Sequence, residues 1–264
     1  MLHRRRSLLA SIIVLVATLA LAAGCGDDDG GGGGGGGDNI PSELTVGSDI
    51  PYPPFEFGKP PYKGFDLDVV NAIAKRLGSR ATFKKTPFDT IFRDLAQGKF
   101  DLVASATTIT PERAKTVDFS DPYFPADQSL MVKRGSDIKG VDDLAGKTVG
   151  AQLATTGAAY AKDRTDAKTV RTYDLIDDAF NALEAGQVQA VINDCPVSKY
   201  AERAHEDLVV VQAIQTNERY GLAFRKGSNA LREAVNRELA RLRDSGELQR
   251  ISDKWLGPEP CQLR

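Results

Sequence analysis

The 264-residue sequence has little histidine and little cysteine, two of the first and three of the second. His3 lies in an N-terminal segment that we expect to be removed, which leaves His205 as the histidine of the mature chain. This scarcity disfavours histidine-based metal sites and Ser-His-Asp triads. Lysine and arginine total 34 against 36 aspartate and glutamate, so the positive excess of a nucleic-acid-binding protein is missing. The composition, 41% hydrophobic and 27% charged, excludes collagen-like, wholly disordered and multi-span membrane classes.

The N-terminus has the features of a secretory signal peptide. Three arginines at 4–6 precede an uncharged, mostly apolar stretch at 7–24. Such a segment is removed on export when a processing site closes it. Here it closes with LAAGC at 21–25, which resembles the bacterial lipobox, although the leucine stands one place earlier than in the commonest pattern. We therefore expect a signal peptide at 1–24 and acylation of Cys25; the alternative is an uncleaved anchor, since eighteen apolar residues can just span a bilayer.

A glycine-rich segment follows Cys25. Three aspartates at 27–29 are followed by eight glycines at 30–37. Glycine has no side chain to bury and a large backbone entropy, so such a run behaves as a flexible coil. We expect residues 25–40 to form a lipidated tether that holds the following domain at a membrane surface. Removal of 1–24 takes away three arginines and no acids, which changes the net charge from −2 to −5.

Two cysteines remain besides Cys25, and both lie in the C-terminal third. An even number of cysteines in an exported chain favours a disulfide, here between Cys195 and Cys261. Such a bond would staple the C-terminal tail to the body of the domain. Two free buried thiols are the alternative, because sequence does not give the distance between them.

From Leu44 onward, short β-rich runs alternate with helical apolar spacing. Strands are expected at 44–47, 101–104, 147–150, 168–171 and 190–192, and helices at 66–77, 88–95, 157–163, 177–185, 229–242 and 248–255. The alternation predicts parallel sheets covered by helices, an α/β fold. Because the pattern of the first half recurs in the second, we expect two α/β lobes with a ligand cleft between them.

Three pairs of segments carry a family resemblance. They are DIPYPPFEF at 49–57 with GFDLD at 64–68, TITPER at 108–113 with DFSDPY at 118–123, and ND at 193–194 with YGLAFRKGS at 220–228. In this order they resemble the extracellular solute-binding proteins, family 3, which are the receptors of polar amino-acid ABC importers. The likeness runs from about residue 44 to residue 257.

The resemblance implies a periplasmic-binding-protein-like fold of type II, two α/β lobes joined by a two-strand hinge. It places lobe 1 at 44–124 and 221–264 and lobe 2 at 129–215, with crossovers near 124–128 and 216–220.

A free amino acid presents a carboxylate, and Arg113 matches the arginine that binds it in the family. A guanidinium is a planar fork of donors suited to bidentate capture of a carboxylate. Thr108, on the same loop, can add its hydroxyl and backbone N–H, and Thr155 and Thr156 lie near a helix start where N–H groups meet anions. The alternative for Arg113 is a surface arginine paired with Glu112 or a neighbouring acid.

The ammonium of the amino acid needs an acceptor, and Asp194 matches the family's acid for this role. It follows the predicted strand 190–192 at the carboxyl end. Ser105 and the carbonyl of Ala106 are expected to share the ammonium. The alternative for Asp194 is a helix N-cap, a position that aspartate favours.

Four further residues are expected around the ligand's side chain. Tyr52 and Phe88 would form apolar walls, with plain core aromatics as the alternative. Asp49 adds a negative charge, and a neutral Gln152 leaves that charge unopposed. Burial of a second carboxylate beside Asp49 would be costly, so acidic ligands are disfavoured. The residues predict arginine or lysine as ligand, then glutamine.

Several conspicuous residues are expected to be structural. The acids Glu56, Asp66, Asp68 and Asp118 are expected to cap helices or brace loops. Trp255 is expected in the core, and His205 on a solvated face.

The resemblance implies the substrate-binding lipoprotein of an amino-acid ABC importer, outside the cytoplasm and lipid-anchored to the cell membrane. Its partners would be a free amino acid, the permease in the membrane and the membrane itself; a monomer is expected, with no nucleic acid, metal or organic cofactor. Two other functions stay open. One is an amino-acid-sensing module for a membrane receptor. The other is an enzyme like the cyclohexadienyl dehydratases, which share the fold; only Asp49 is a spare acid for such chemistry.

Overall fold

The computed structural model describes residues 40–257 and 261 of the chain. The expected signal peptide, the expected lipidation of Cys25 and the expected glycine-rich tether up to residue 39 lie outside the described residues. Within the described part, the helices are too short or too polar to cross a membrane.

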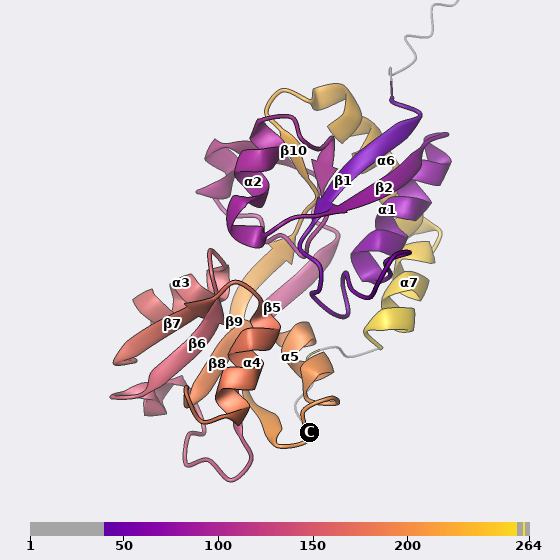
Figure 1. The fold of residues 1–264 in the computed structure, drawn as a ribbon. Helices are drawn as coiled ribbons and strands as arrows, with labels where there is room; N and C mark the ends of the chain where they lie inside the picture. The colour runs from indigo at the N-terminus through magenta and orange to yellow at the C-terminus, as the bar shows by residue number, and fades with distance from the viewer. Residues whose placement is uncertain (1–39, 258–260, 262–264) are drawn as a thin grey trace, which may run out of the picture. The chain divides into compact units, whose positions relative to one another are not determined.

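The first sheet has the strand order β2-β1-β3-β10-β4. Its strands are β1 (Glu43–Ser48), β2 (Arg80–Lys85), β3 (Leu102–Val103), β4 (Val117–Phe119) and β10 (Ala223–Arg225). The helices around it are α1 (Phe65–Arg76), α2 (Phe88–Ala96), α6 (Asn229–Asp244) and α7 (Glu247–Trp255). We call this sheet and its helices lobe 1 (Figure 1).

The second sheet has the order β7-β6-β8-β5-β9. Its strands are β5 (Phe124–Lys133), β6 (Thr148–Gln152), β7 (Thr169–Tyr173), β8 (Ala190–Asp194) and β9 (Leu208–Tyr220). The helices around it are α3 (Thr156–Asp163), α4 (Ile176–Glu184) and α5 (Cys195–Ala201). We call this sheet and its helices lobe 2. The two α/β lobes agree with the predicted fold class.

Both sheets are mixed, so the prediction of parallel sheets is right for only part of each. β1 runs parallel to β2 and β3, and β6 runs parallel to β7 and β8. β10 is antiparallel to β3 and β4, and β5 is antiparallel to β8 and β9. The parallel strands are linked through helices, as parallel pairing requires. β5 and β10 each enter their sheet directly from the other lobe, and the alternation of strand and helix carries no sign of their direction.

Strands β5 and β9 carry the chain between the lobes. They pair from Phe124 opposite Tyr220 to Lys133 opposite Leu208, with register shifts at 126–128 and 130–131. Figure 1 shows the pair running from the second sheet toward the first. The segments expected as crossovers, 124–128 and 216–220, are the ends of these strands next to lobe 1.

The helices form where apolar spacing predicts them. In α2, Phe88, Ile91 and Leu95 recur at helical spacing and are buried against β3 and β10. Gly98 follows the helix with φ +78°, the left-handed conformation that glycine adopts without the steric cost of a Cβ. The helix predicted at 88–95 is therefore confirmed, and it ends at Ala96. The same pattern orders α1, whose apolar face packs on α6 and α7.

Two of the residues expected to be structural have specific partners. The ring of Trp255 is half-buried, and its Nε1 donates to Asp68 Oδ2 at 2.7 Å. His205 was expected on a solvated face, but its side chain is only 20% exposed. Its Nδ1 lies 2.9 Å from Glu184 Oε1, and its ring packs 6.0 Å from that of Phe180. The charged neighbours of His205 gave no sign of this contact with α4.

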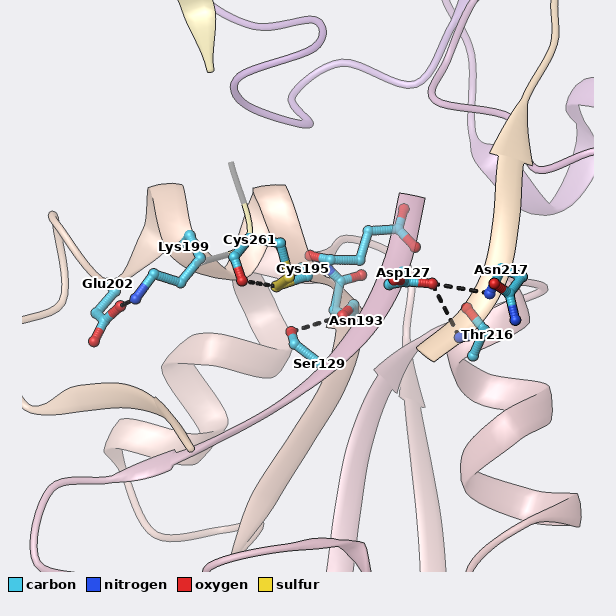
Figure 2. Close-up of a disulfide and its surroundings, with 10 residues drawn as sticks. Asp127, Ser129, Asn193, Cys195, Lys199, Glu202, Thr216, Asn217 and Cys261 are labelled. Atoms are coloured by element: carbon cyan, nitrogen blue, oxygen red, sulfur yellow. Dashed lines mark hydrogen bonds and ion pairs between the residues drawn. A yellow bond between two sulfur atoms is a disulfide. The ribbon is translucent and has the colours of Figure 1, made fainter. Parts of the chain in front are cut away.

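A disulfide joins Cys195 to Cys261 across 66 residues of sequence, with the Cα atoms 5.5 Å apart. Figure 2 shows the bond at the start of α5, close to Asn193 at the end of β8. Helix α7 packs on α1 and α6 of lobe 1, and the chain then reaches Cys261, which is bonded to lobe 2. The C-terminal segment therefore ties the two lobes together.

Candidate functional site

A narrow pocket lies between the lobes, at the carboxyl ends of their parallel strands. Its lining consists of the eleven residues predicted to bind ligand: Asp49, Tyr52, Phe88, Ser105, Ala106, Thr108, Arg113, Gln152, Thr155, Thr156 and Asp194. Lobe 1 contributes the loops after β1 and β3 and the first residue of α2. Lobe 2 contributes the end of β6, the start of α3 and the end of β8. The structure thus brings together residues that are up to 145 positions apart.

Arg113 reaches the pocket from the first turn of a short 3₁₀ helix, Arg113–Lys115. Its Nη1 donates to the carbonyl of Thr108 at 2.8 Å and its Nη2 to the carbonyl of Ala154 in lobe 2 at 3.2 Å. The guanidinium carbon lies 5.2 Å and 5.0 Å from the ring centroids of Phe88 and Phe92. Both distances are in the range of cation–π attraction. These contacts fix the guanidinium plane at the pocket wall.

The surface alternative for Arg113 does not describe its surroundings. The side chain of Glu112 pairs with Lys115, and Arg113 points into the pocket. Burial lowers the pKa of Arg113, while the negative charges of Asp194 and Glu218 act in the opposite direction. Arginine stays protonated under such shifts. The pocket therefore keeps a fixed positive charge at this end.

The threonines near Arg113 use their hydroxyls differently. Thr155 is the N-cap of α3: its Oγ1 accepts from Ala158 N at 3.1 Å and donates to the carbonyl of Gln152 at 2.7 Å. The hydroxyls of Thr108 and Thr156 both donate to Glu218 Oε2, at 2.9 Å and 2.7 Å. The hydroxyl proton of Thr155 is thus committed to the turn, whereas those of Thr108 and Thr156 meet at one carboxylate oxygen.

Glu218 was not among the predicted residues, although one pattern in the sequence points to it. It lies on β9 two places before Tyr220, and residues i and i+2 of a strand share a face. Tyr220 begins one of the segments that carry the family resemblance. Two more missed residues, Gln128 on β5 and Tyr220 itself, also reach the site from the strands between the lobes.

Asp194 ends β8 and occupies the N-cap position of α5, but its side chain makes no capping hydrogen bond. Its Oδ2 accepts from the hydroxyls of Tyr52 at 2.7 Å and Tyr220 at 2.6 Å, and its Oδ1 accepts from Gln128 Nε2 at 2.5 Å. Burial and the nearby charge of Glu218 raise the pKa of Asp194 to about 6, although the hydrogen bonds from these three donors lower it. A carboxylate has about four acceptor positions, so three donors leave room for one more.

Asp49 follows β1 and is 2% exposed. Its Oδ2 accepts from Gln152 Nε2 at 2.6 Å across the two lobes. Burial raises its pKa to about 7, and the charge of Asp89 adds to the rise, while Gln152 and the charge of Lys85 oppose it. The sequence predicted that Gln152 leaves Asp49 unopposed; the structure adds a hydrogen bond, but from a neutral amide. The charge of Asp49 therefore stays uncompensated by any direct cationic contact among the described residues.

The two predicted aromatic walls differ. Phe88 lies under the guanidinium of Arg113. Tyr52 is polar on its pocket side, because its hydroxyl donates to Asp194 Oδ2 at 2.7 Å and lies 3.0 Å from Asn193 Oδ1. Tyr52 therefore links the lobes through the acid as well as lining the pocket.

A second layer of buried acids holds the loop after β3. Ser105 Oγ accepts from Asp49 N at 2.9 Å and donates to Glu56 Oε1 at 2.7 Å. Ala106, with φ +45°, donates its N–H to Asp66 Oδ2 at 2.7 Å. Burial raises the pKa of Glu56 well above its usual range and that of Asp66 to about 7. These acids brace the loop, as was predicted for them.

The chemistry of the site is that of polar recognition. Among residues 40–257 and 261, no three His, Cys, Asp or Glu side chains are grouped so that they could hold a metal ion. The pocket combines one fixed cation, Arg113, with two carboxylates, Asp194 and Asp49, and with hydroxyl groups. Such a set can satisfy a small zwitterion and one further polar or positive group.

Comparisons with known proteins agree with this chemistry. Residues 44–258 match the bacterial extracellular solute-binding proteins, family 3. An L-cystine-binding protein of Escherichia coli (strain K12) is 34% identical over 221 residues, 82% of this chain and 83% of the relative. ABC transporter arginine-binding protein 1 of the same strain is 33% identical over 221 residues, 81% of this chain and 90% of the relative. The structure of an ancestral arginine-binding protein bound to glutamine superposes with a TM-score of 0.79 at 39% identity, covering 83% of this chain and 99% of that one. The chain belongs to the bacterial extracellular solute-binding proteins, family 3.

Proposed function

We propose that the protein is the substrate-binding component of an amino-acid ABC importer and captures a free polar amino acid between its lobes. The observation that carries this proposal is one pocket that holds the cation Arg113 and the buried carboxylate Asp194. An amino acid presents the complementary pair, a carboxylate and an ammonium. The relatives named above for cystine and arginine binding support the same class of ligand.

In this proposal the carboxylate of the ligand lies at Arg113. The guanidinium supplies two parallel donors, and the hydroxyls of Thr108 and Thr156 and the N–H groups at the start of α3, beside Thr155, supply the others. Charge-assisted hydrogen bonds of this kind are stronger than neutral ones.

The ammonium lies at Asp194 and takes the remaining acceptor position of its carboxylate. Ser105 and the carbonyl of Ala106 line the same pocket and complete the three acceptors that an ammonium requires. Tyr52, Tyr220 and Gln128 hold the carboxylate in place for this contact.

Asp49 sets the preferred side chain of the ligand. Its carboxylate is buried and is met by a neutral amide, so a guanidinium or ammonium at the far end of the ligand would be stabilised by it. An acidic ligand would bring a second negative charge and be excluded. We therefore propose arginine or lysine as ligand, then glutamine, whose amide can hydrogen-bond with Asp49.

Replacement of Asp49 by asparagine is expected to separate these ligands. The variant loses the negative charge and keeps the size, so the Kd for arginine should rise about tenfold to thirtyfold. The Kd for glutamine should change less than threefold, roughly, because no full charge is lost from that contact. Titration calorimetry with both ligands measures the effect. Equal losses for both would show that Asp49 does not discriminate by charge.

The affinity for arginine is expected to depend on pH through Asp49. Below a pKa of about 7 this carboxyl is protonated, and a cationic ligand then loses its partner. From pH 8 to pH 6 the Kd for arginine should rise about tenfold. The titratable groups that act on or near Asp49 are Lys85, Asp89 and the buried Glu56.

Glutamine provides the control for this titration. Asp194, with a pKa of about 6, contacts the ammonium that both ligands share. Its protonation should therefore weaken arginine and glutamine equally, and the ratio of the two Kd values isolates Asp49. A ratio that stays constant between pH 6 and pH 8 would contradict the assignment.

We also propose that the protein is exported, acylated at Cys25 and delivers its ligand to a membrane permease as a tethered monomer. The signal-like segment at 1–24, the LAAGC sequence and the run of glycines support this. Mass spectrometry of the membrane fraction tests it, because acylation adds a defined mass to a peptide that begins at Cys25.

The experiment that tests the function is a thermal-shift screen of the mature chain against the twenty amino acids. A ligand at a hundred times its Kd stabilises the folded protein by about 2.7 kcal/mol. Arginine, lysine or glutamine should raise the melting temperature. A shift with glutamate or aspartate alone would still support the transport function, but it would contradict the proposal that Asp49 excludes acidic ligands. A lack of response to every amino acid, with turnover of prephenate or arogenate, would favour the enzyme alternative.

A further inference from the structure

We propose that Glu218 is a built-in competitor of the ligand's carboxylate: it holds the hydroxyls of Thr108 and Thr156 until an amino acid takes them, and so lowers the affinity of the pocket. This inference rests on the proposed function.

The geometry places one carboxylate oxygen between the lobes. Thr108 Oγ1, from the loop after β3 of lobe 1, donates to Glu218 Oε2 at 2.9 Å. Thr156 Oγ1, from the start of α3 in lobe 2, donates to the same oxygen at 2.7 Å. Gln128 Nε2 lies 3.4 Å from it. Glu218 itself comes from β9, which connects the lobes, so its side chain joins both lobes at the pocket.

Glu218 and the ligand's carboxylate compete because each threonine hydroxyl has a single proton to donate. A threonine hydroxyl has one proton and can donate it to one acceptor at a time. Thr108 and Thr156 both line the pocket beside Arg113. If the carboxylate of an amino acid takes these two donors, Glu218 must give them up. The two carboxylates have the same acceptor chemistry, so one replaces the other.

Charge acts in the same direction. The negative charge of Glu218 favours the protonated form of Arg113 and raises the pKa of Asp194, so it acts on both residues proposed to bind the ligand. A second carboxylate beside Arg113 is repelled by Glu218, whose negative charge already acts on Arg113. A contact that is made without ligand and lost with ligand stabilises the free protein only, and its removal favours the bound protein.

Substitution of Glu218 by glutamine tests the competition. Glutamine keeps the size and one acceptor oxygen but has no charge, so the Kd for arginine and for glutamine should fall about tenfold. Both ligands should gain equally, because they share the carboxylate. Equal or weaker binding by E218Q overturns the proposal; weaker binding would mean that Glu218 itself holds the ligand's ammonium.

Asp127 provides the matched control. It lies on β5, in the same pair of strands, and its Oδ1 accepts from the N–H groups of Thr216 and Asn217 at 3.0 Å and 2.9 Å (Figure 2). D127N removes the same charge from the strands between the lobes without touching a pocket residue. Its Kd should stay within about twofold of that of the parent chain. A tenfold gain in D127N as well would assign the effect to net charge and overturn the proposal.

A second measurement needs no ligand. Because Glu218 joins Thr108 to Thr156, E218A should increase the radius of gyration of the protein in small-angle X-ray scattering without added amino acid, while D127N should not. An unchanged radius in E218A overturns the joining role. A parent chain that binds none of the twenty amino acids overturns the proposed function, and the scattering result then decides the role of Glu218 alone.

Discussion

Replacement of Arg113 by alanine is expected to raise the Kd for the amino acid about a thousandfold, since a buried carboxylate that loses its charged partner costs several kcal/mol. The variant also loses the bond from Nη2 to the carbonyl of Ala154, which joins the lobes. Titration calorimetry with arginine and with glutamine should give similar losses, because both ligands have the same carboxylate. A melting curve without ligand checks that the variant is folded.

The lysine variant is the control for this prediction. R113K keeps the positive charge but replaces the planar fork by a single ammonium, which no longer donates two parallel hydrogen bonds. Its Kd should lie between those of the parent chain and R113A, about thirtyfold above the first. If R113A binds as tightly as the parent chain, the ligand's carboxylate lies elsewhere.

Replacement of Asp194 by asparagine is expected to raise the Kd about a hundredfold. The ammonium loses its counter-charge. The amide also disturbs the site, because it turns an NH₂ group toward one of three donors, Tyr52, Tyr220 and Gln128, that all point at Asp194. Two donors that face each other cannot form a hydrogen bond.

Tyr52→Phe separates these two effects. It removes one donor from Asp194 and leaves the charge of the carboxylate intact. Its Kd should rise less than about tenfold, well below the rise in D194N. If both variants lose the same amount, the hydrogen-bond arrangement dominates and the charge contributes little. Binding by D194N within threefold of the parent chain would place the ammonium away from this acid.

The residues that line the pocket were predictable because they lie in contiguous segments. Thr108 and Arg113 share one loop, and Thr155 and Thr156 are neighbours that start a helix, so a family resemblance reaches them one motif at a time. Asp194 was predictable from its place after a strongly apolar strand. Helix α2 was predictable from its apolar spacing alone.

The residues that were missed meet the site through long-range contacts. Glu218 contacts Thr108 and Thr156, which precede it by 110 and 62 residues. Nothing in the local sequence specifies these partners. Strand β9 alternates half-buried and exposed residues near Glu218, which is typical of many surface strands. The hydrogen bond of the Tyr52 hydroxyl is also long-range, because its acceptor, Asp194, lies 142 residues later in the sequence.

The direction of the strands was the other feature that the sequence could not predict. An apolar run predicts a strand but gives no direction, and direction depends on how the chain enters the sheet. β5 brings the chain from lobe 1 into lobe 2, and β9 takes it back. The two strands therefore run in opposite directions because of the two-lobe topology. The prediction of parallel sheets therefore failed at these strands.

The disulfide limits how the lobes can move. A protein whose chain crosses twice between its halves can bend and twist about the paired strands, here β5 and β9. The bond between Cys195 and Cys261 adds a third covalent crossing. Cys261 follows Gly257 by four residues, and four residues span at most about 14 Å. The disulfide attaches this link of four residues to Cys195, one residue after Asp194 at the wall of the pocket, and so limits the distance between Gly257 and that wall. With the disulfide formed, the two lobes can separate only as far as this link allows. A chain with reduced cysteines keeps its pocket residues but loses this limit.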